Sequence, residues 1–479
     1  MQTVPINVLD MRSARWQAAA AALLLAAVGI SFGIVQQPFL FIGVVVGTIV
    51  LAVAIAAPLA LVALALTLGG VDLSFLTGGF KALFPHLGGL DMNGIRLVGA
   101  TVGFTVYILN APVGRNAIFG KHGLLYVVFL AYAFLTLSYS FDPLEGLRLH
   151  LKLAYPLLTF LLIIGLCDTR EKIEKLANYT LIAGALIIFA VIPLYILKNG
   201  FDVDHEGFRR LNGVGGGANP LSFYLMALLL LAFARLVSRK QLRYLFFCVG
   251  AATWIILTVT RITFLATLIG VAMISLLAAL AQKQYKAVAG GVLVTLMLAV
   301  PGLPFILDRS LGFVPSPGEL FALITNPTAL YESINWQGRT NLWPIVWAGF
   351  MAAPITGLGL GSSGVVIREH FPADAAQVAH NEYLRLGADT GLVGIALFAV
   401  AMSVWLFSAL RACAHPDRHV AEYAIPAAAA IVAWAIIAIT DNPFDYYMYF
   451  TQYVGFLMGS MIALQHIAAR EQRGDHRLS

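Results

Sequence analysis

Long apolar runs recur along almost the whole 479-residue chain, and no other feature of the sequence limits its fold as strongly. Runs close to the roughly 20 residues that cross a bilayer extend from Trp16 to Gln465, separated by short polar stretches. Only 11% of the residues are charged, where a soluble domain has about 25%. Because no water-soluble core could enclose so much apolar surface, the sequence predicts an all-α fold, a polytopic transmembrane helix bundle.

The apolar runs give a total of 12 to 14 expected spans. The first run follows Arg12 and Arg15 without a clear cleavage site, so we expect an uncleaved first helix. The run at 39–69 is too long for one crossing; Pro58 offers a turn that would split it, although one long tilted helix also fits. The candidate spans are 17–35, 39–69, 95–111, 122–140, 150–167, 176–197, 219–237, 243–259, 262–281, 287–306, 390–411, 421–440 and 446–467.

The basic residues fall in alternate loops, which predicts the orientation of the chain. By the positive-inside rule these loops and both termini are cytoplasmic, and two cytoplasmic termini require an even number of spans, which favours 14. The same loops account for the net charge of +6, so we expect no nucleic-acid partner. The basic loops contain Arg115 and Lys121; Arg170, Lys172 and Lys175; Arg239, Lys240 and Arg243; Lys283 and Lys286; Arg411 and Arg418; and the residues from Arg470 to Arg477.

The remaining loops are expected on the outer, periplasmic side. They cover 70–94, 141–149, 198–218, the point around Arg261, 308–389 and 441–445. Within the long segment 308–389, the stretch from Leu342 to Pro354 is apolar but too short to cross, and tryptophans lie in and near it. It is predicted to form an interfacial or re-entrant helix.

Four arginines on the predicted outer side need an explanation, because that side is otherwise poor in basic residues: Arg209, Arg210, Arg261 and Arg339. The planar guanidinium group suits phosphate oxygens. Arg261 joins two apolar runs with almost no loop between them, and a charge at that depth usually faces a wet cavity. Each arginine also fits a structural role, reaching to lipid headgroups or capping a helix.

Other polar features of the outer loops are compatible with chemistry but also with plain structure. The glycine-rich stretch 211–220 precedes a span, where it suits an anion or a flexible turn. The glycines at 357–364 follow no strand of a βαβ unit, so a tight turn is expected rather than a dinucleotide loop. His380 could accept a proton from a sugar hydroxyl, and it could equally be a structural histidine at a helix start.

No metal or cofactor is expected from the sequence. Asp441 and Asp445 could touch a saccharide, and they equally fit a helix cap in a short turn. No paired acidic motif on the outer side calls for a metal. The three cysteines lie in separate apolar runs with no paired spacing, so neither a disulfide nor a cysteine-bound metal is predicted.

Taken together, the outer segments resemble the O-antigen ligase and O-antigen polymerase family, with the best agreement over about 205–411. The matching pieces are Arg210 ahead of Ala218-Asn219-Pro220, Thr258-Val-Thr-Arg261, Gly338-Arg339-Thr-Asn-Leu-Trp343, Pro354-Ile-Thr-Gly-Leu-Gly-Leu-Gly361, His380-Asn381-Glu382-Tyr-Leu-Arg385 and Gly391-Leu-Val-Gly394. One departure is Thr260-Arg261-Ile262, where a Ser-Arg-Gly sequence is common in the family; the bulkier isoleucine predicts a different local backbone.

The resemblance implies a membrane glycosyltransferase that transfers or polymerises saccharides from an undecaprenyl-diphosphate-linked oligosaccharide in the bacterial inner membrane. It carries the general base onto His380 and the phosphate-binding role onto Arg210 and Arg261, with Arg209 a neighbour. Arg339, Asn381 and Glu382 lie in its motifs and are predicted to bind substrate. Transfer is expected to invert the anomeric centre without a metal. The acceptor, another glycan or lipid A core, is left open, as is the choice between ligase and polymerase.

The expected organisation follows from the same comparison. Residues 1–197 would form an N-terminal transmembrane bundle, 198–411 the catalytic core with its periplasmic helical segment 308–389, and 412–479 the last spans and a cytoplasmic tail. The alternative from another class is a secondary transporter or flippase for a lipid-linked or anionic substrate. It would place ionisable groups near the bilayer midplane in two similar halves, a pattern this sequence does not show.

Overall fold

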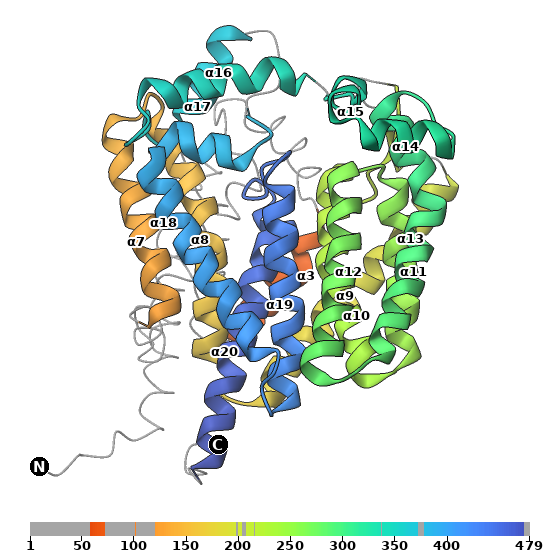
Figure 1. The fold of residues 1–479 in the computed structure, drawn as a ribbon. Coiled ribbons are helices and arrows are strands. Elements are labelled where there is room, and N and C mark those ends of the chain that lie inside the picture. Colours follow the sequence, from red (N-terminus) through yellow and green to blue (C-terminus); the bar gives the residue numbers. More distant parts are fainter. Residues whose placement is uncertain are drawn as a thin grey trace, which may run out of the picture.

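The computed structural model shows a helical bundle with one end covered by short helices (Figure 1). It describes residues 58–71, 101, 120–197, 200–203, 207–214, 216–336, 338–371 and 378–473. The predicted spans 17–35 and 95–111, and the part of 39–69 before Pro58, lie outside the described residues, so the total number of spans stays a prediction. In the described part, α3 begins at Pro58 (Pro58–Thr67).

Within the described residues, eight helices are long and apolar enough to cross a membrane, which confirms the all-α transmembrane fold. They are α7 (Lys121–Leu135, continued by η2, Thr136–Tyr139), α8 (Pro143–Leu166), α9 (Arg170–Ile196), α10 (Ala218–Arg239), α12 (Arg261–Gln282), α13 (Lys286–Leu311), α18 (Glu382–Ala412) and α19 (Arg418–Ile437). The shorter α11 (Leu242–Leu257) and the C-terminal α20 (Gln452–Gln472) also belong to the bundle.

Polar residues at the predicted boundaries set where these helices begin. Asp142, Thr169 and Asn381 each accept a backbone N–H at the first turn of α8, α9 and α18. The long helix α18 starts eight residues earlier than the predicted span at 390–411 and bends at Gly391, whose φ is 65°. The polar lead that the sequence suggested is therefore already helical.

Helix α10 lies at the centre of the bundle, and its apolar residues are buried all round from Leu221 to Ala234. Helix α13 is the opposite case, with only 22% of its apolar window buried inside the chain. A helix that is apolar on every side but exposed on most of them is suited to a lipid environment. The bundle thus has its own packed core and a surface for acyl chains.

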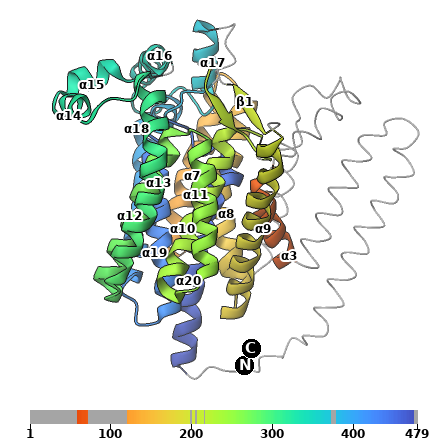
Figure 2. The same cartoon turned by 90° about the vertical axis from the view of Figure 1, so that its right-hand side faces the viewer.

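One end of the bundle is covered by the segment predicted at 308–389, and we call it the α16 end. Helices α16 (Arg339–Ala352) and α17 (Ser362–His370) lie across it, with α14 (Pro317–Thr325) and α15 (Pro327–Ser333) to one side (Figures 1 and 2). Helix α16 occupies the stretch predicted to be an interfacial helix. The basic turns between α8 and α9, α10 and α11, α12 and α13, and α18 and α19 fall at the opposite end.

Candidate active site

A small hairpin at the α16 end sends two neighbouring arginines in different directions. Strands β1 (Phe201–Val203) and β2 (Arg209–Leu211) pair in antiparallel fashion. Alternation along β2 leaves Arg209 exposed, with its guanidinium carbon 4.5 Å from the ring centre of Phe201. Arg210 instead turns inward, and its Nε donates to the carbonyl of Thr258 at 3.0 Å.

Arg210 is the first member of a hydrogen-bonded chain that ends at His380. Its Nη2 donates to Asn219 Oδ1 at 2.6 Å, and Asn219 Nδ2 donates to Asp441 Oδ2 at 3.0 Å. The other oxygen of Asp441, Oδ1, lies 3.5 Å from His380 Nδ1. The Asp441 side chain is 3% exposed and that of His380 is 30% exposed. We call Arg210, Asn219, Asp441 and His380 the relay; it joins segments more than 200 residues apart in the sequence.

Arg261 lies next to the relay at the first residue of α12. Arg210 Nη2 also donates to the hydroxyl of Thr260, at 3.0 Å, so the Arg210 guanidinium reaches the residue directly before Arg261. Arg261 Nη1 donates to the carbonyl of Asn335 at 2.6 Å. A further arginine, Arg309, donates to the carbonyl of Val259 at 2.5 Å and is 5% exposed. Arg309 also lies in the predicted outer segment 308–389, so its charge on that side is a signal that could have marked it as a candidate.

The backbone is strained at His380 and at Val259, two residues before Arg261. Four described non-glycine residues have positive φ: Lys240, Val259, Lys283 and His380. The two lysines end helices α10 and α12, where that conformation is common. Val259, with φ of 50°, holds the turn into Arg261, and His380 has φ of 47°. Strain kept at such positions by the surrounding structure is typical of functional sites.

A cavity of about 250 Å³ opens beside the relay. His380, Asp441 and Tyr446 line one part of it. The rest of the lining carries both charges and consists of Glu145, Leu149, Lys152, Gly361, Ser363, Gly364, Val378, Arg385, Asp389 and Asp445. A polar cavity of this size at the end of a membrane bundle suits a hydroxyl-rich ligand better than an apolar one.

An ion cluster holds the wall of this cavity together. Asp445 accepts from Lys152 Nζ at 2.7 Å through one oxygen and from Arg385 Nη1 at 2.8 Å through the other. Arg385 also pairs with Glu382 at 2.7 Å. Burial alone would raise the pKa of the Asp445 carboxyl, but the charges of Arg385 and Lys152 outweigh burial and lower the pKa to about 2. Asp445 is therefore ionised at neutral pH.

The glycine motifs form another part of the wall. Gly357, Gly359 and Gly361 all have positive φ, and the loop they make packs against the bend in α18. A Cβ on Gly391 would lie 2.2 Å from the backbone oxygen of Ile355, so the two segments can touch only with glycine there. Asp389 then accepts the backbone N–H groups of Gly361 and Ser363 at 3.0 and 2.7 Å.

The other predicted substrate-binding residues already have structural partners. Asn381 caps α18 by accepting the N–H of Leu384 at 2.9 Å. Glu382 is fully buried and ion-paired with Arg385. Arg339 begins α16, where its Nη1 donates to the carbonyl of Trp336 at 3.2 Å. The relay links Arg210 to His380, and Arg210 also contacts Thr260, the residue before Arg261. Of the predicted site residues, His380 lines the cavity, whereas the lining does not include Arg209, Arg210, Arg261, Arg339, Asn381 or Glu382.

Lys152 and Arg385 were not predicted as site residues, although both line the cavity. Lys152 lies within a predicted span, where a lysine two residues inside the boundary is itself a signal of an intramembrane partner. Arg385 stands in the motif that begins at His380, three residues after Glu382, a spacing that brings the two side chains together on a helix. In the described residues, no group of three or more His, Cys, Asp or Glu side chains is arranged to hold a metal ion.

Comparison with known families gives a match over part of the chain. Residues 226–399 match the family model Wzy_C, described as O-Antigen ligase. The match supports an assignment to the O-antigen ligase family. The matched region contains Arg261, Arg339 and His380, whereas Arg210 and Asp441 lie on either side of it in the sequence. No curated protein matches the chain significantly. The family assignment supports a membrane protein that acts on lipid-linked glycans.

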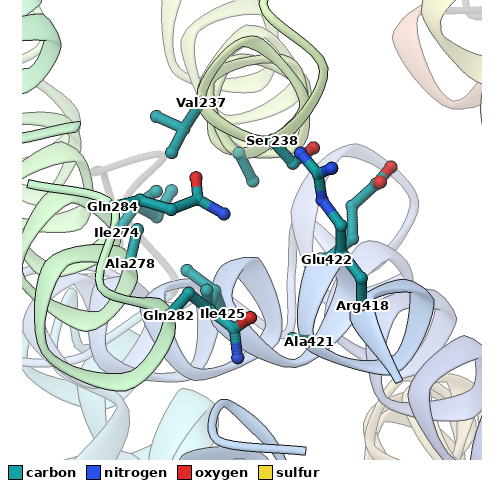
Figure 3. Close-up of a pocket in the computed structure, with 11 residues that line it drawn as sticks. Val237, Ser238, Ile274, Ala278, Gln282, Gln284, Arg418, Ala421, Glu422 and Ile425 are labelled. Carbon is teal, nitrogen blue, oxygen red and sulfur yellow. The ribbon is translucent and has the colours of Figure 1, made fainter. Parts of the chain in front are cut away.

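The opposite end of the bundle also contains a buried ion cluster, and the pocket beside it is much smaller than the cavity at the α16 end. Arg235, 0% exposed, pairs with Glu174 at 3.0 Å and donates to Tyr423 Oη at 2.8 Å. Arg239 joins Glu174 to Glu422. Figure 3 shows the pocket beside this cluster, between Ser238, Gln282 and Glu422; its volume is about 20 Å³, room for about one water molecule.

Proposed function

We propose that this O-antigen ligase family member transfers a saccharide from an undecaprenyl-diphosphate-linked donor at the α16 end of the bundle, which faces the periplasm. The observation that carries the proposal is the relay of Arg210, Asn219, Asp441 and His380 beside a polar cavity. The relay connects the Arg210 guanidinium to an imidazole that lines the cavity, and this connection supports a site with both a phosphate-binding cation and a base. The basic turns at the opposite end support the proposed orientation, with that end in the cytoplasm.

The arginines would act on the leaving group. The Arg210 guanidinium contacts Thr260, the residue directly before Arg261, and we assign both guanidinium groups to one diphosphate. As the bond from the anomeric carbon to the phosphate oxygen breaks, the diphosphate gains negative charge, and fixed cations stabilise it. The acceptors of these arginines include the backbone carbonyls of Thr258 and Asn335, which are neutral and which a phosphate would outcompete.

His380 would act on the acceptor. With a proton on Nδ1 facing Asp441, its Nε2 is left as an acceptor for the proton of a sugar hydroxyl. The hydroxyl oxygen forms the new bond to the anomeric carbon as the diphosphate leaves from the other face, so the centre inverts. The proton then passes from His380 to solvent. Asp441 is the positioning residue that fixes the tautomer.

The acceptor decides between a ligase and a polymerase, and an assay separates them. Purified protein in lipid nanodiscs is incubated with a carrier-linked oligosaccharide, with or without lipid A core. A ladder of products without core identifies a polymerase, and a product only with core identifies a ligase. If neither appears, while the donor is carried across vesicles instead, the transfer proposal is wrong and a transporter is favoured.

Matched variants test the assigned roles in the same assay. His380→Ala is expected to lower transfer by a factor on the order of 10² to 10⁴, whereas His370→Ala, on exposed α17 outside the cavity, should leave it unchanged. Arg210→Lys and Arg261→Lys keep the charge but lose the planar fork and should impair donor use. Arg209→Lys is their control, since Arg209 lies over Phe201 outside the relay. Normal transfer by His380→Ala would exclude a general base at this position.

A further inference from the structure

Helices α14 and α15 form an arm that the rest of the chain does not cover. Across Pro317–Thr325 and Pro327–Ser333, all of which the structure describes, no residue is buried. Phe321 is 70% exposed, Ile324 60% and Tyr331 56%. Figure 2 shows the arm projecting beyond the side of the bundle at the α16 end. Large apolar side chains gathered on such an element indicate that something else covers them.

The arm has the sequence of an amphipathic surface helix. At helical spacing, Leu320, Phe321, Leu323 and Ile324 of α14 share one side, whereas Glu319 and Ala322 lie on the other. Ser316 and Glu319 form a reciprocal capping box that fixes the start of the helix. The helix therefore has its own support and does not depend on packing against the bundle.

The exposed surface of α13 indicates what kind of environment covers the arm. Val300, 70% exposed, and Phe305, 52% exposed, belong to the most exposed of the eight candidate spans, so they face acyl chains. The exposed apolar surface continues through Phe313 and Val314 into Phe321, with only residues 312–316 between α13 and α14. The arm thus begins at the level where a membrane span ends, and its apolar side extends a surface that already contacts lipid.

The charges of the arm indicate the kind of lipid contact. Residues 312–338 contain no lysine or arginine and only two acidic residues, Glu319 and Glu332. Attraction to anionic headgroups therefore cannot hold the arm at the surface, and apolar insertion must. Tyr331 and Trp336, whose rings lie 5.2 Å apart at the base of the arm, are residue types enriched at the headgroup level.

We propose that the α14–α15 arm docks into the outer boundary of the bilayer at the α16 end, with Phe321 and Ile324 among the acyl chains. The occupant of the apolar side is thus the lipid leaflet itself. This inference concerns the membrane and does not depend on the reaction that the cavity supports.

The base of the arm is connected to both halves of the candidate site. Asn335 donates its N–H to the carbonyl of Ser310 at 2.7 Å and accepts from Arg261 Nη1 at 2.6 Å. The ring of Trp336 lies 5.8 Å from that of Trp343. Trp343 Nε1 in turn donates to the carbonyl of Ala379 at 3.0 Å, immediately before His380. This step rests on the proposed function: a docked arm would hold Arg261 and His380 in place at the surface where a lipid-linked donor arrives.

Depth-dependent fluorescence quenching tests the docking directly. Single cysteines at Phe321, Ile324 and, on the other side of α14, Ala322 are labelled with an environment-sensitive fluorophore. The native cysteines, all buried, are replaced by alanine. The protein is reconstituted in neutral phosphatidylcholine vesicles containing lipid with a quencher near the headgroup end of an acyl chain. Labels at 321 and 324 should be quenched several-fold more than the label at 322, with no increase when anionic lipid is added.

Two results would overturn the proposal. Equal quenching at all three sites would mean that α14 has no lipid-facing side. Blue-shifted emission at 321 and 324 without lipid quenching would mean that protein, such as a second copy of the chain, covers them. Neither result depends on enzymatic activity, so a failed transfer assay leaves the docking test intact.

A second experiment tests the consequence for the reaction. Phe321→Asp combined with Ile324→Asp should raise the KM for a carrier-linked donor several-fold in vesicles, while Ala322→Asp should not. Because these side chains are exposed, their replacement is not expected to disturb folding. An unchanged KM together with lost quenching would show that the arm docks without supporting the site.

Discussion

The two ends of the bundle contain ion clusters of similar chemistry but different surroundings. At the opposite end, Arg235 and Arg239 share Glu174 and Glu422, and the space beside them is about 20 Å³. At the α16 end, Lys152 and Arg385 share Asp445 next to a cavity of about 250 Å³. The presence of arginine and carboxylate side chains alone therefore does not identify a ligand-binding site in this protein.

This difference shows that open space beside the charges, rather than the charges themselves, distinguishes a ligand site from a purely structural ion cluster. The cluster at the opposite end joins α9, α10 and α19 and neutralises itself, with Arg235 closed off from solvent. The α16 end adds the relay, whose last member, His380, remains 30% exposed to the cavity. One cluster can only hold helices together, while the other can also meet a ligand.

The largest expected effect tests whether the opposite end is purely structural. Glu422→Gln removes a charge shared by Arg235 and Arg239 and leaves buried cations undercompensated, which should lower the free energy of unfolding by about 3–5 kcal/mol. Transfer activity per folded molecule should not change. Thermal unfolding in detergent measures the first effect, and the nanodisc assay corrected for folded protein measures the second.

Glu171→Gln is the matched control at that end. Glu171 pairs with Lys175 at 2.8 Å, but its side chain is 73% exposed, so solvent screens the pair and stability should hardly change. A loss of transfer activity in folded Glu422→Gln protein would contradict this comparison, because the cluster at the opposite end would then take part in the reaction.

The next effect concerns Asp445, which should stabilise the fold in a pH-dependent way. Its pKa is about 2 in the folded chain and about 3.9 when unfolded, so its charge contributes roughly 2–3 kcal/mol at neutral pH. Since the folded pKa is the lower one, this contribution is complete above about pH 4 and is lost as the pH falls through 2. The difference in unfolding temperature between wild type and Asp445→Asn should shrink over that window and stay constant from pH 5 to 8.

Glu145→Gln serves as a comparison within the same cavity, because Glu145 is 38% exposed and pairs with Arg148 at 3.3 Å. Its effect on stability should be smaller than that of Asp445→Asn. A stability difference for Asp445→Asn that does not change below pH 4 would contradict the assignment of Asp445 as the ionised centre of the cluster.

A smaller effect, on turnover rather than folding, is expected at Asp441. Asp441→Asn keeps the shape but loses the charge that faces His380 Nδ1, so kcat should fall by about 10- to 100-fold with little change in KM. The shape of the pH–kcat profile should change as well, which a merely structural role would not produce. Asp308→Asn, at the same end but outside the cavity lining, is the control. A variant that raised only KM would make Asp441 a substrate contact instead of a positioning residue.

Most of the bundle could be predicted from the sequence because each span carries its own signal. Apolar length predicted the helices from α7 to α13, with the starts of α8 and α9 placed six to seven residues too late, and the short apolar stretch with its tryptophans predicted α16. The start of α18 was predicted too late, because Glu382 and Arg385 read as polar loop residues. In the fold they neutralise each other inside the bundle, and no local pattern shows that pairing.

The candidate site was only partly predictable for a similar reason. Arg210, Arg261 and His380 drew notice because their charge or chemistry is unusual on the outer side. Asp441 was left open between a saccharide contact and a helix cap, and its role in joining Asn219 to His380 depends on distant helices that the sequence cannot align. Asn381 was predicted to bind substrate because it lies in the motif that begins at His380; its side chain caps a helix, a role that the motif did not indicate, and substrate binding stays a prediction.

The smallest effect decides between these two views of Asn381. As the N-cap of α18, Asn381 accepts the N–H of Leu384 at 2.9 Å, so Asn381→Ala should lower stability by about 1 kcal/mol. Asn381→Ser should restore most of it, because serine also caps, and the KM for the donor should stay unchanged in both variants. Substrate binding predicts another pattern, in which KM rises and serine does not restore it. Measuring the unfolding temperature and the KM on the same preparations therefore decides whether Asn381 acts as a helix cap or as a substrate contact. The same measurements show whether this part of the α16 end supports the fold or binds the substrate.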